Sequence, residues 1–171
     1  SMTIENFRDF YKPSKEKKYV AINSSIIQAL DIVEASMKTK SIIINKEYNS
    51  KKELALFNHE LMQVFLNIFK NAQDNFEDKK IDNPIMSIIT SDIENGIRVD
   101  ICDNGGGIAD EIKNSVFDPY FSTKDEKNGT GLGLYMSKMI IEEHHGGKFY
   151  FKNIDDGVCF SVEIFDKVDK K

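Results

Sequence analysis

The pattern of apolar and polar positions predicts a mixed α/β domain. Between 52 and 76 the apolar residues recur every three or four positions, which predicts one long amphipathic helix. Shorter helices are expected at 25–37, where Ser25 and Gln28 have the spacing of a capping box, and at 134–144. β-rich segments predict strands at 19–22, 41–47, 86–94, 97–103, 148–153 and 158–164.

These elements predict an α/β (α+β) sandwich. The turn sequences Asn95-Gly96 and Asp155-Asp156-Gly157 would join two pairs of strands as hairpins, so the sheet should be mixed and largely antiparallel. About three helices would cover one face and leave the other more exposed. We expect the domain to span 17–166. Residues 1–16 would hold a tag residue, Ser1, and an incoming linker, and 167–171 a charged tail.

Composition narrows the functional classes. The chain has 171 residues, 40% of them hydrophobic, which suffices for one buried core. The net charge of −5 argues against nucleic acid as a partner. No apolar run reaches membrane-spanning length, so direct membrane contact is not expected and the fragment should lie in the cytoplasm. Cys102 and Cys159 stand far apart on strand-like segments and are interpreted as buried free thiols.

Two glycine-rich segments are the strongest candidates for a ligand site. Residues 103–108 read Asp-Asn-Gly-Gly-Gly-Ile after a predicted strand, and 129–134 read Gly-Thr-Gly-Leu-Gly-Leu before a predicted helix. Glycine lets the backbone approach a ligand closely, and amides at a helix N-terminus favour phosphate. The spacing matches neither a dinucleotide fingerprint nor a P-loop. Either segment alone could also be an ordinary surface loop.

The polar side of the long helix is unusual. Its stripe consists of Glu60, Gln63, Asn67, Asn71 and Asp74. Asparagine is a poor helix former, so two asparagines one turn apart suggest oxygen ligands for Mg²⁺ and its phosphates. A plain solvent-facing stripe is the alternative.

Three further features bear on chemistry. Asp103, at a strand end, could accept a hydrogen bond from the exocyclic amine of adenine, or could simply form a turn. Phe117 and Phe121 would anchor a loop able to close over a ligand. His144 and His145 are interpreted as cations at a helix end.

Taken together, the motifs resemble the ATP-binding catalytic domain of sensor histidine kinases, in the superfamily of DNA gyrase, Hsp90 and MutL proteins. The resemblance covers about residues 18–165. It rests on four boxes in order: an N box at 59–72, a G1 box at 103–107, an F box at 117–121 and a G2 box at 129–134. It implies a Bergerat-type ATP-binding fold with ATP and Mg²⁺ as cofactors.

The resemblance also assigns roles. Asn67 and Asn71 would hold Mg²⁺ and position the phosphates, and Lys124 would contact the γ-phosphate. The remaining candidates for binding the nucleotide are Lys70, Asp103, Gly105, Gly107, Ile108, Phe117, Phe121, Thr130, Gly131, Leu132 and Gly133. Some members carry a basic residue and a tyrosine soon after the N-box Asn-Ala. This chain has 73–76 Gln-Asp-Asn-Phe instead, so that phosphate contact is missing or comes from Lys70.

The resemblance implies partners as well. Such kinases phosphorylate a histidine on their own dimerisation helix and signal to a response regulator. Residues 7–13 resemble the end of the second dimerisation helix, so the phosphoacceptor would be missing and the fragment would be a monomer without efficient autophosphorylation. His59 lies inside the N box and is interpreted as structural. The full-length protein could be membrane-anchored.

Rival interpretations stay open at this point. An ATP-hydrolysing clamp of the gyrase or Hsp90 type would need a basic carboxylate where Asn67 stands. A non-catalytic nucleotide-binding module is a second alternative. An anti-sigma serine kinase shares the fold, but the F box and the N-terminal residues argue against it.

Overall fold

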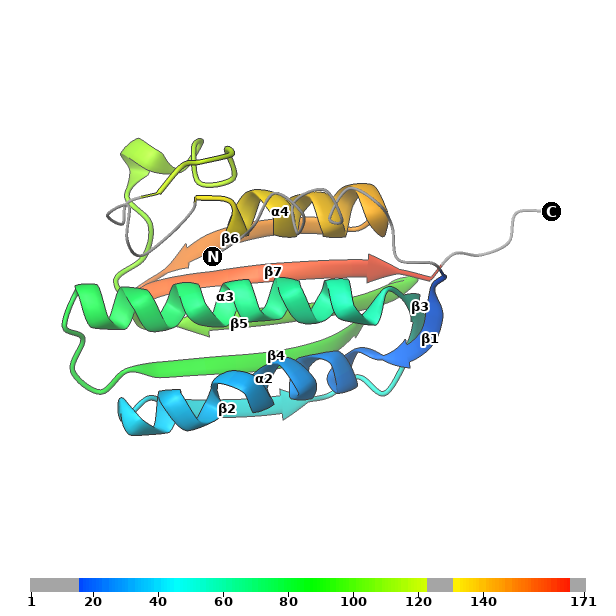
Figure 1. Ribbon diagram of the computed structural model, residues 1–171, viewed down its shortest axis with the longest axis horizontal. Helices are drawn as coiled ribbons and strands as arrows, with labels where there is room; N and C mark the ends of the chain where they lie inside the picture. Colours follow the sequence, from blue (N-terminus) through cyan, green and yellow to red (C-terminus); the bar gives the residue numbers. More distant parts are fainter. Residues whose placement is uncertain (1–15, 123–130, 167–171) are drawn as a thin grey trace.

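The computed structural model describes residues 16–122 and 131–166, which form a sheet with helices packed on one face (Figure 1). The sheet has five strands in the order β2-β4-β5-β7-β6. They are β2 (Ile43–Tyr48), β4 (Ile85–Ile93), β5 (Gly96–Asp103), β6 (Lys148–Ile154) and β7 (Gly157–Phe165). Only the β2–β4 pair is parallel, which confirms the predicted mixed, mostly antiparallel sheet.

Three helices cover this face. They are α2 (Ile22–Thr39), α3 (Asn58–Asp78) and α4 (Gly133–Met139), and α4 continues into a π-helical turn, η2 (Ile140–His144). A short 3-10 turn, η1 (Asp110–Ile112), follows the first glycine segment. Within the described ranges, no helix combines the length and apolar character needed to cross a membrane.

The core lies between α3 and the central strands. One face of α3 is buried because its apolar residues recur at helical spacing, while β5 buries every second residue. The residues that meet there include Leu61, Val64, Phe65, Ile68, Phe69, Met86, Ile88, Val99, Ile101, Phe160 and Val162. This packing fixes α3 above β5, so the polar side of α3 runs past the end of β5 at Asp103.

The predicted start of the long helix is wrong. Residues Glu53–Leu56 form a strand, β3, which pairs antiparallel with β1 (Lys18–Ala21), and α3 begins only at Asn58. Leu54 and Leu56 are both buried, as expected for a strand with period two. Because Leu54, Phe57 and Leu61 also fit a helical spacing, the sequence pattern merged a strand into the helix that follows it.

The predicted capping box is also wrong. Helix α2 begins at Ile22, immediately after β1, and has no side-chain cap. Ser25 lies inside the helix and is buried, and its hydroxyl donates to Asn58 Oδ1 at 2.6 Å. The serine therefore joins α2 to the start of α3.

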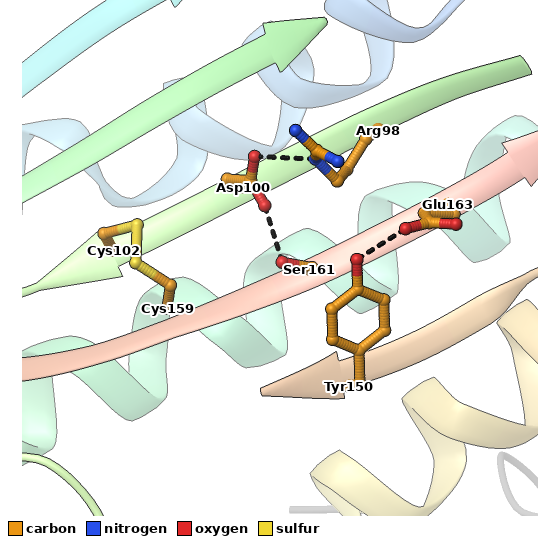
Figure 2. A network of polar contacts seen from close by, with 7 residues as sticks. All are labelled: Arg98, Asp100, Cys102, Tyr150, Cys159, Ser161 and Glu163. Carbon is orange, nitrogen blue, oxygen red and sulfur yellow. Dashed lines mark hydrogen bonds and ion pairs between the residues drawn. A yellow bond between two sulfur atoms is a disulfide. The ribbon is translucent and has the colours of Figure 1, made fainter. Parts of the chain in front are cut away.

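The two cysteines are not free thiols. Cys102 on β5 lies directly opposite Cys159 on β7, with 4.0 Å between their Cα atoms, and the two form a disulfide (Figure 2). Both side chains are half-buried on the face of the sheet away from the helices. The pairing of two strands 57 residues apart in sequence decides this contact, and no local pattern encodes it.

Several predictions concern residues outside the described ranges. These are the linker and helix remnant within 1–15, the charged tail 167–171, and the site candidates Lys124 and Thr130.

Candidate functional site

The polar side of α3 contacts the second glycine segment at Asn67. The Asn67 amide nitrogen donates to the Gly133 carbonyl and to the Ser137 hydroxyl, both at 3.1 Å, and its oxygen accepts from Gln63 at 3.0 Å. Ser137 is fully buried on α4. Asn67 therefore holds the first turns of α4 against α3.

Two helical turns further along, α3 meets the first glycine segment. A Cβ on Gly105 would lie 3.4 Å from the Cβ of Asn75 and 3.0 Å from Asp103 Oδ1. Asn67, Asn71 and Asn75 are four residues apart, so they follow one stripe of the helix over roughly 12 Å. The two glycine segments therefore lie against the same side of α3, with Asn71 between them.

The Asn71 side chain is available for a ligand. It is half-buried, and no described residue hydrogen-bonds to its amide. A neutral amide oxygen on a helix flanked by glycine segments fits Mg²⁺, which prefers oxygen ligands and keeps several waters. Among the described residues no cluster of acidic, histidine or cysteine ligands competes as a metal site.

Asp103 ends β5 as a buried carboxylate. It is 6% exposed, and its Oδ1 accepts from the Gly105 amide at 2.8 Å. Burial raises the pKa of Asp103, while the backbone hydrogen bond from Gly105 and the charge of Lys79 partly offset this, together with a backbone hydrogen bond from Val158. Such a carboxyl group, above the first glycine segment, can accept a hydrogen bond from a bound amine.

Two side chains outside the motifs brace the first glycine segment. Asn153 on β6 accepts from the Ile108 amide at 2.9 Å and donates to the Ile108 carbonyl at 2.7 Å. Lys79 donates to the Gly107 carbonyl at 3.1 Å. The sequence reasoning missed both residues. An asparagine within a strand, where it is a poor former, was the one available signal for Asn153.

The second glycine segment makes a tight contact with the F box. Gly131 has φ 72°, and a Cβ there would lie 2.4 Å from the carbonyl carbon of Tyr120. Only glycine allows both this conformation and this approach. Leu132 is buried, and Gly133 begins α4. The close contact fixes the Gly131–Gly133 backbone beside the F box.

The F box is anchored by an aromatic cluster. The Phe117 ring lies 5.3 Å from that of Phe149 and 5.9 Å from that of Phe151, and the Lys138 ammonium sits 4.5 Å above it. This agrees with the predicted anchoring role of Phe117. Phe121 is half-buried, and Ile108 packs against the core. Lys70, by contrast, is exposed on α3, and the structure places it in no contact that defines the site.

The two histidines at the end of η2 were both predicted to be cations, and the structure contradicts this for His145. His144 Nδ1 contacts Glu60 Oε1 at 2.9 Å and so joins η2 to α3. His145 is buried; its Nε2 accepts from the Phe57 amide and its Nδ1 donates to the Ile140 carbonyl. Because Nε2 accepts, it carries no proton and the ring is neutral, so the prediction of a cation at His145 is wrong. His59 is exposed.

The chain is similar to known proteins over most of its length. The family described as "Histidine kinase-, DNA gyrase B-, and HSP90-like ATPase" matches residues 58–168. Sporulation kinase A of Bacillus subtilis is 29% identical over 151 residues, which are 86% of this chain and 24% of that protein. Sensor histidine kinase ZraS of Escherichia coli is 31% identical over 128 residues, which are 74% of this chain and 26% of that protein. The chain thus spans about a quarter of the length of these curated relatives.

Solved structures of histidine kinases are also similar to this chain. A nucleotide-free catalytic domain of histidine kinase ThkA superposes with a TM-score of 0.78 at 29% identity, covering 88% of this chain and 96% of that one. ThkA in complex with the response regulator TrrA superposes with a TM-score of 0.73 at 26% identity, covering 96% of this chain and 47% of that one. The fold, the order of the four boxes and these similarities agree. The chain belongs to the family of histidine kinase-, DNA gyrase B- and HSP90-like ATPases, and its relatives in that family are sensor histidine kinases.

Proposed function

We propose that this domain binds Mg-ATP and acts as the catalytic unit of a sensor histidine kinase. In that role it donates the γ-phosphate to a histidine on a dimerisation helix, for signalling to a response regulator. The proposal rests chiefly on Asn71, an amide without a hydrogen-bond partner among the described residues, midway between the two glycine segments on one stripe of α3.

In this proposal Asp103 selects the base. Its buried carboxylate accepts a hydrogen bond from the adenine amine, which guanine lacks at the equivalent position. Gly105 and Gly107 let the backbone approach the ring, while Ile108, Phe117 and Phe121 supply apolar surface. Asn153 and Lys79 keep this wall in place through the Ile108 and Gly107 backbone.

The phosphates would extend from there along α3. Asn71 and Asn67 would hold Mg²⁺, which when bound neutralises phosphate charge. Asn71 is the freer ligand, because the Asn67 oxygen already accepts from Gln63 while its nitrogen donates to Gly133 and Ser137. The amides of Gly131, Leu132 and Gly133 receive the triphosphate, with Thr130, Lys70 and Lys124 as further contacts. The domain thus contributes positioning and charge neutralisation, and no covalent step.

The surroundings of Asn67 disfavour a hydrolytic clamp. An amide has no useful basicity, and this one is held by Gly133 and Ser137, so it cannot activate water. A kinase needs no such base here, since its acceptor would be a histidine of another domain. The ThkA–TrrA complex supports a response regulator as the downstream partner.

Calorimetry with a non-hydrolysable ATP analogue tests the binding part of the proposal. We expect Mg²⁺-dependent binding and much weaker binding of the matching GTP analogue. Absence of binding in the presence of Mg²⁺ would overturn the proposal. Steady ATP hydrolysis by this chain would instead favour the clamp.

Phosphotransfer is tested separately with γ-labelled ATP. The chain alone should incorporate no acid-labile label, whereas a chain that includes the dimerisation helices should incorporate it on histidine. Labelling of the isolated chain would contradict the proposal that its phosphoacceptor lies elsewhere, and no labelling of the longer chain would contradict the kinase assignment.

A further inference from the structure

The disulfide joins the two strands that carry the adenine end of the proposed site. Cys102 and Cys159 form one rung of the β5–β7 ladder, and Asp103 and Val158 form the next. The Asp103 carboxylate accepts from the Gly105 amide, and the backbone of Asp103 is paired with Val158 across the ladder. The cysteines are therefore next in sequence to Asp103 and to its strand partner Val158.

Side chains on a strand alternate between faces, so the sulfurs and the carboxylate lie on opposite sides of the sheet. Figure 2 shows the cysteines beside a polar network on the helix-free face, in which Asp100 contacts Arg98 and Ser161. Both cysteines are half-buried there. Because both side chains are partly accessible, small redox molecules can reach the pair, while Asp103 stays buried.

The strands are in close contact at this end of the ladder. The Cα atoms of the cysteines lie 4.0 Å apart, whereas the closer kind of antiparallel rung usually has roughly 4.5 Å. Two residues before Cys159, a Cβ on Gly157 would lie 1.6 Å from the Asp103 carbonyl oxygen. The Gly106 amide donates to the Asp156 carbonyl at 2.9 Å. A change in strand spacing at the cysteines therefore acts directly on Asp103 and the first glycine segment.

We propose that Cys102 and Cys159 form a reversible thiol–disulfide site that couples oxidation to the adenine end of the nucleotide site. The oxidant is a low-molecular-weight disulfide such as oxidised glutathione. One cysteine thiolate attacks it and releases a first thiol; the second cysteine then attacks the mixed disulfide and releases another. The pair loses two electrons and two protons, and the small disulfide is reduced to two thiols.

The disulfide form is the one in which Asp103 is held for binding. Reduction lets the rung widen, which loosens the cross-strand contacts that hold the Asp103–Gly106 backbone and so the orientation of the carboxylate. This consequence rests on the proposed ATP function. We expect the reduced form to bind an ATP analogue about threefold to tenfold more weakly, the effect of loosening a single buried hydrogen bond.

The chain is well suited to the test because it contains only two cysteines. The protein is equilibrated at graded ratios of reduced to oxidised glutathione, its free thiols are alkylated and counted by mass, and analogue binding is measured on each form. The C102S/C159S double variant is the control. It should bind the ATP analogue as weakly as the reduced protein does, and its affinity should not change with the glutathione ratio.

Amide hydrogen exchange at Gly105 and Val158 gives a readout that does not depend on nucleotide. It should be slower in the oxidised protein. If both thiols stay alkylatable at every ratio, the redox site is refuted. If the disulfide forms but affinity and exchange are unchanged, the coupling is refuted and the ATP function stands. If neither form binds the analogue, the ATP function fails, and the exchange rates still decide the coupling.

Discussion

Replacing Asp103 with asparagine separates its binding role from its effect on folding. Asn can still accept from the Gly105 amide, as Asp103 Oδ1 now does at 2.8 Å. Its NH₂ group then points a donor at the adenine amine, which is also a donor. The loss of one buried hydrogen bond, with two donor groups left facing each other, should reduce the binding free energy by about 1–3 kcal/mol. ATP-analogue affinity should therefore fall on the order of tenfold to a hundredfold, with a smaller loss for the GTP analogue.

The same variant should make the free protein more stable at neutral pH. Burial raises the pKa of Asp103, so the folded state binds this proton more tightly than the unfolded chain does. The ionised carboxylate therefore lowers stability above its folded pKa, and this cost disappears as pH falls below the unfolded value. D103N removes the charge. Its melting temperature should exceed that of the natural protein at pH 7, and the gap should shrink as the solution is acidified.

Asp100→Asn is the matched control. Asp100 lies on the same strand but faces the opposite side, where it accepts from Arg98 Nε at 3.1 Å. D100N makes the same chemical change, so it should leave analogue affinity unchanged. Calorimetry of analogue binding and thermal melts of both variants test whether Asp103 contacts the base. If D103N binds ATP as tightly as the natural protein, or if D100N loses as much affinity, Asp103 does not contact the base.

Three other predictions follow from the contacts. Asn71→Ala should abolish the Mg²⁺-dependent part of analogue binding without lowering the melting temperature, because no described residue bonds its amide; a large loss of stability would show a structural role instead. Asn153→Ala should remove both hydrogen bonds to the Ile108 backbone, so the free energy of unfolding measured with denaturant should fall by about 1–3 kcal/mol and the ATP analogue should bind more weakly. Unchanged affinity would mean that Asn153 does not shape the site. Reducing the Cys102–Cys159 disulfide, which closes a long loop, should lower the unfolding free energy by about 2–4 kcal/mol, and equal denaturation midpoints with and without reductant would contradict this.

The sequence by itself determined the elements whose signals are local. The hairpin predicted at Asn95-Gly96 forms, although its turn lies one residue earlier: Ile93 pairs with Gly96, and Asn95 takes the left-handed conformation at φ 61°. The core face of α3 was equally readable from its periodicity. The strand at 53–56 was not, since Leu54 and Leu56 satisfy a period of two and, together with their neighbours, a helical spacing.

The site divides in the same way. Asn71, Asp103 and the glycine segments could be named from residue type and order, because each needs a particular chemistry at one position. Their common placement along α3, the Asn153 brace, the neutral His145 and the disulfide depend on pairs far apart in the chain. The packing of the helices on the sheet and the register of β5, β7 and β6 bring those pairs together. Contacts of this kind are decided by tertiary structure, because the geometry of whole elements determines which distant residues meet.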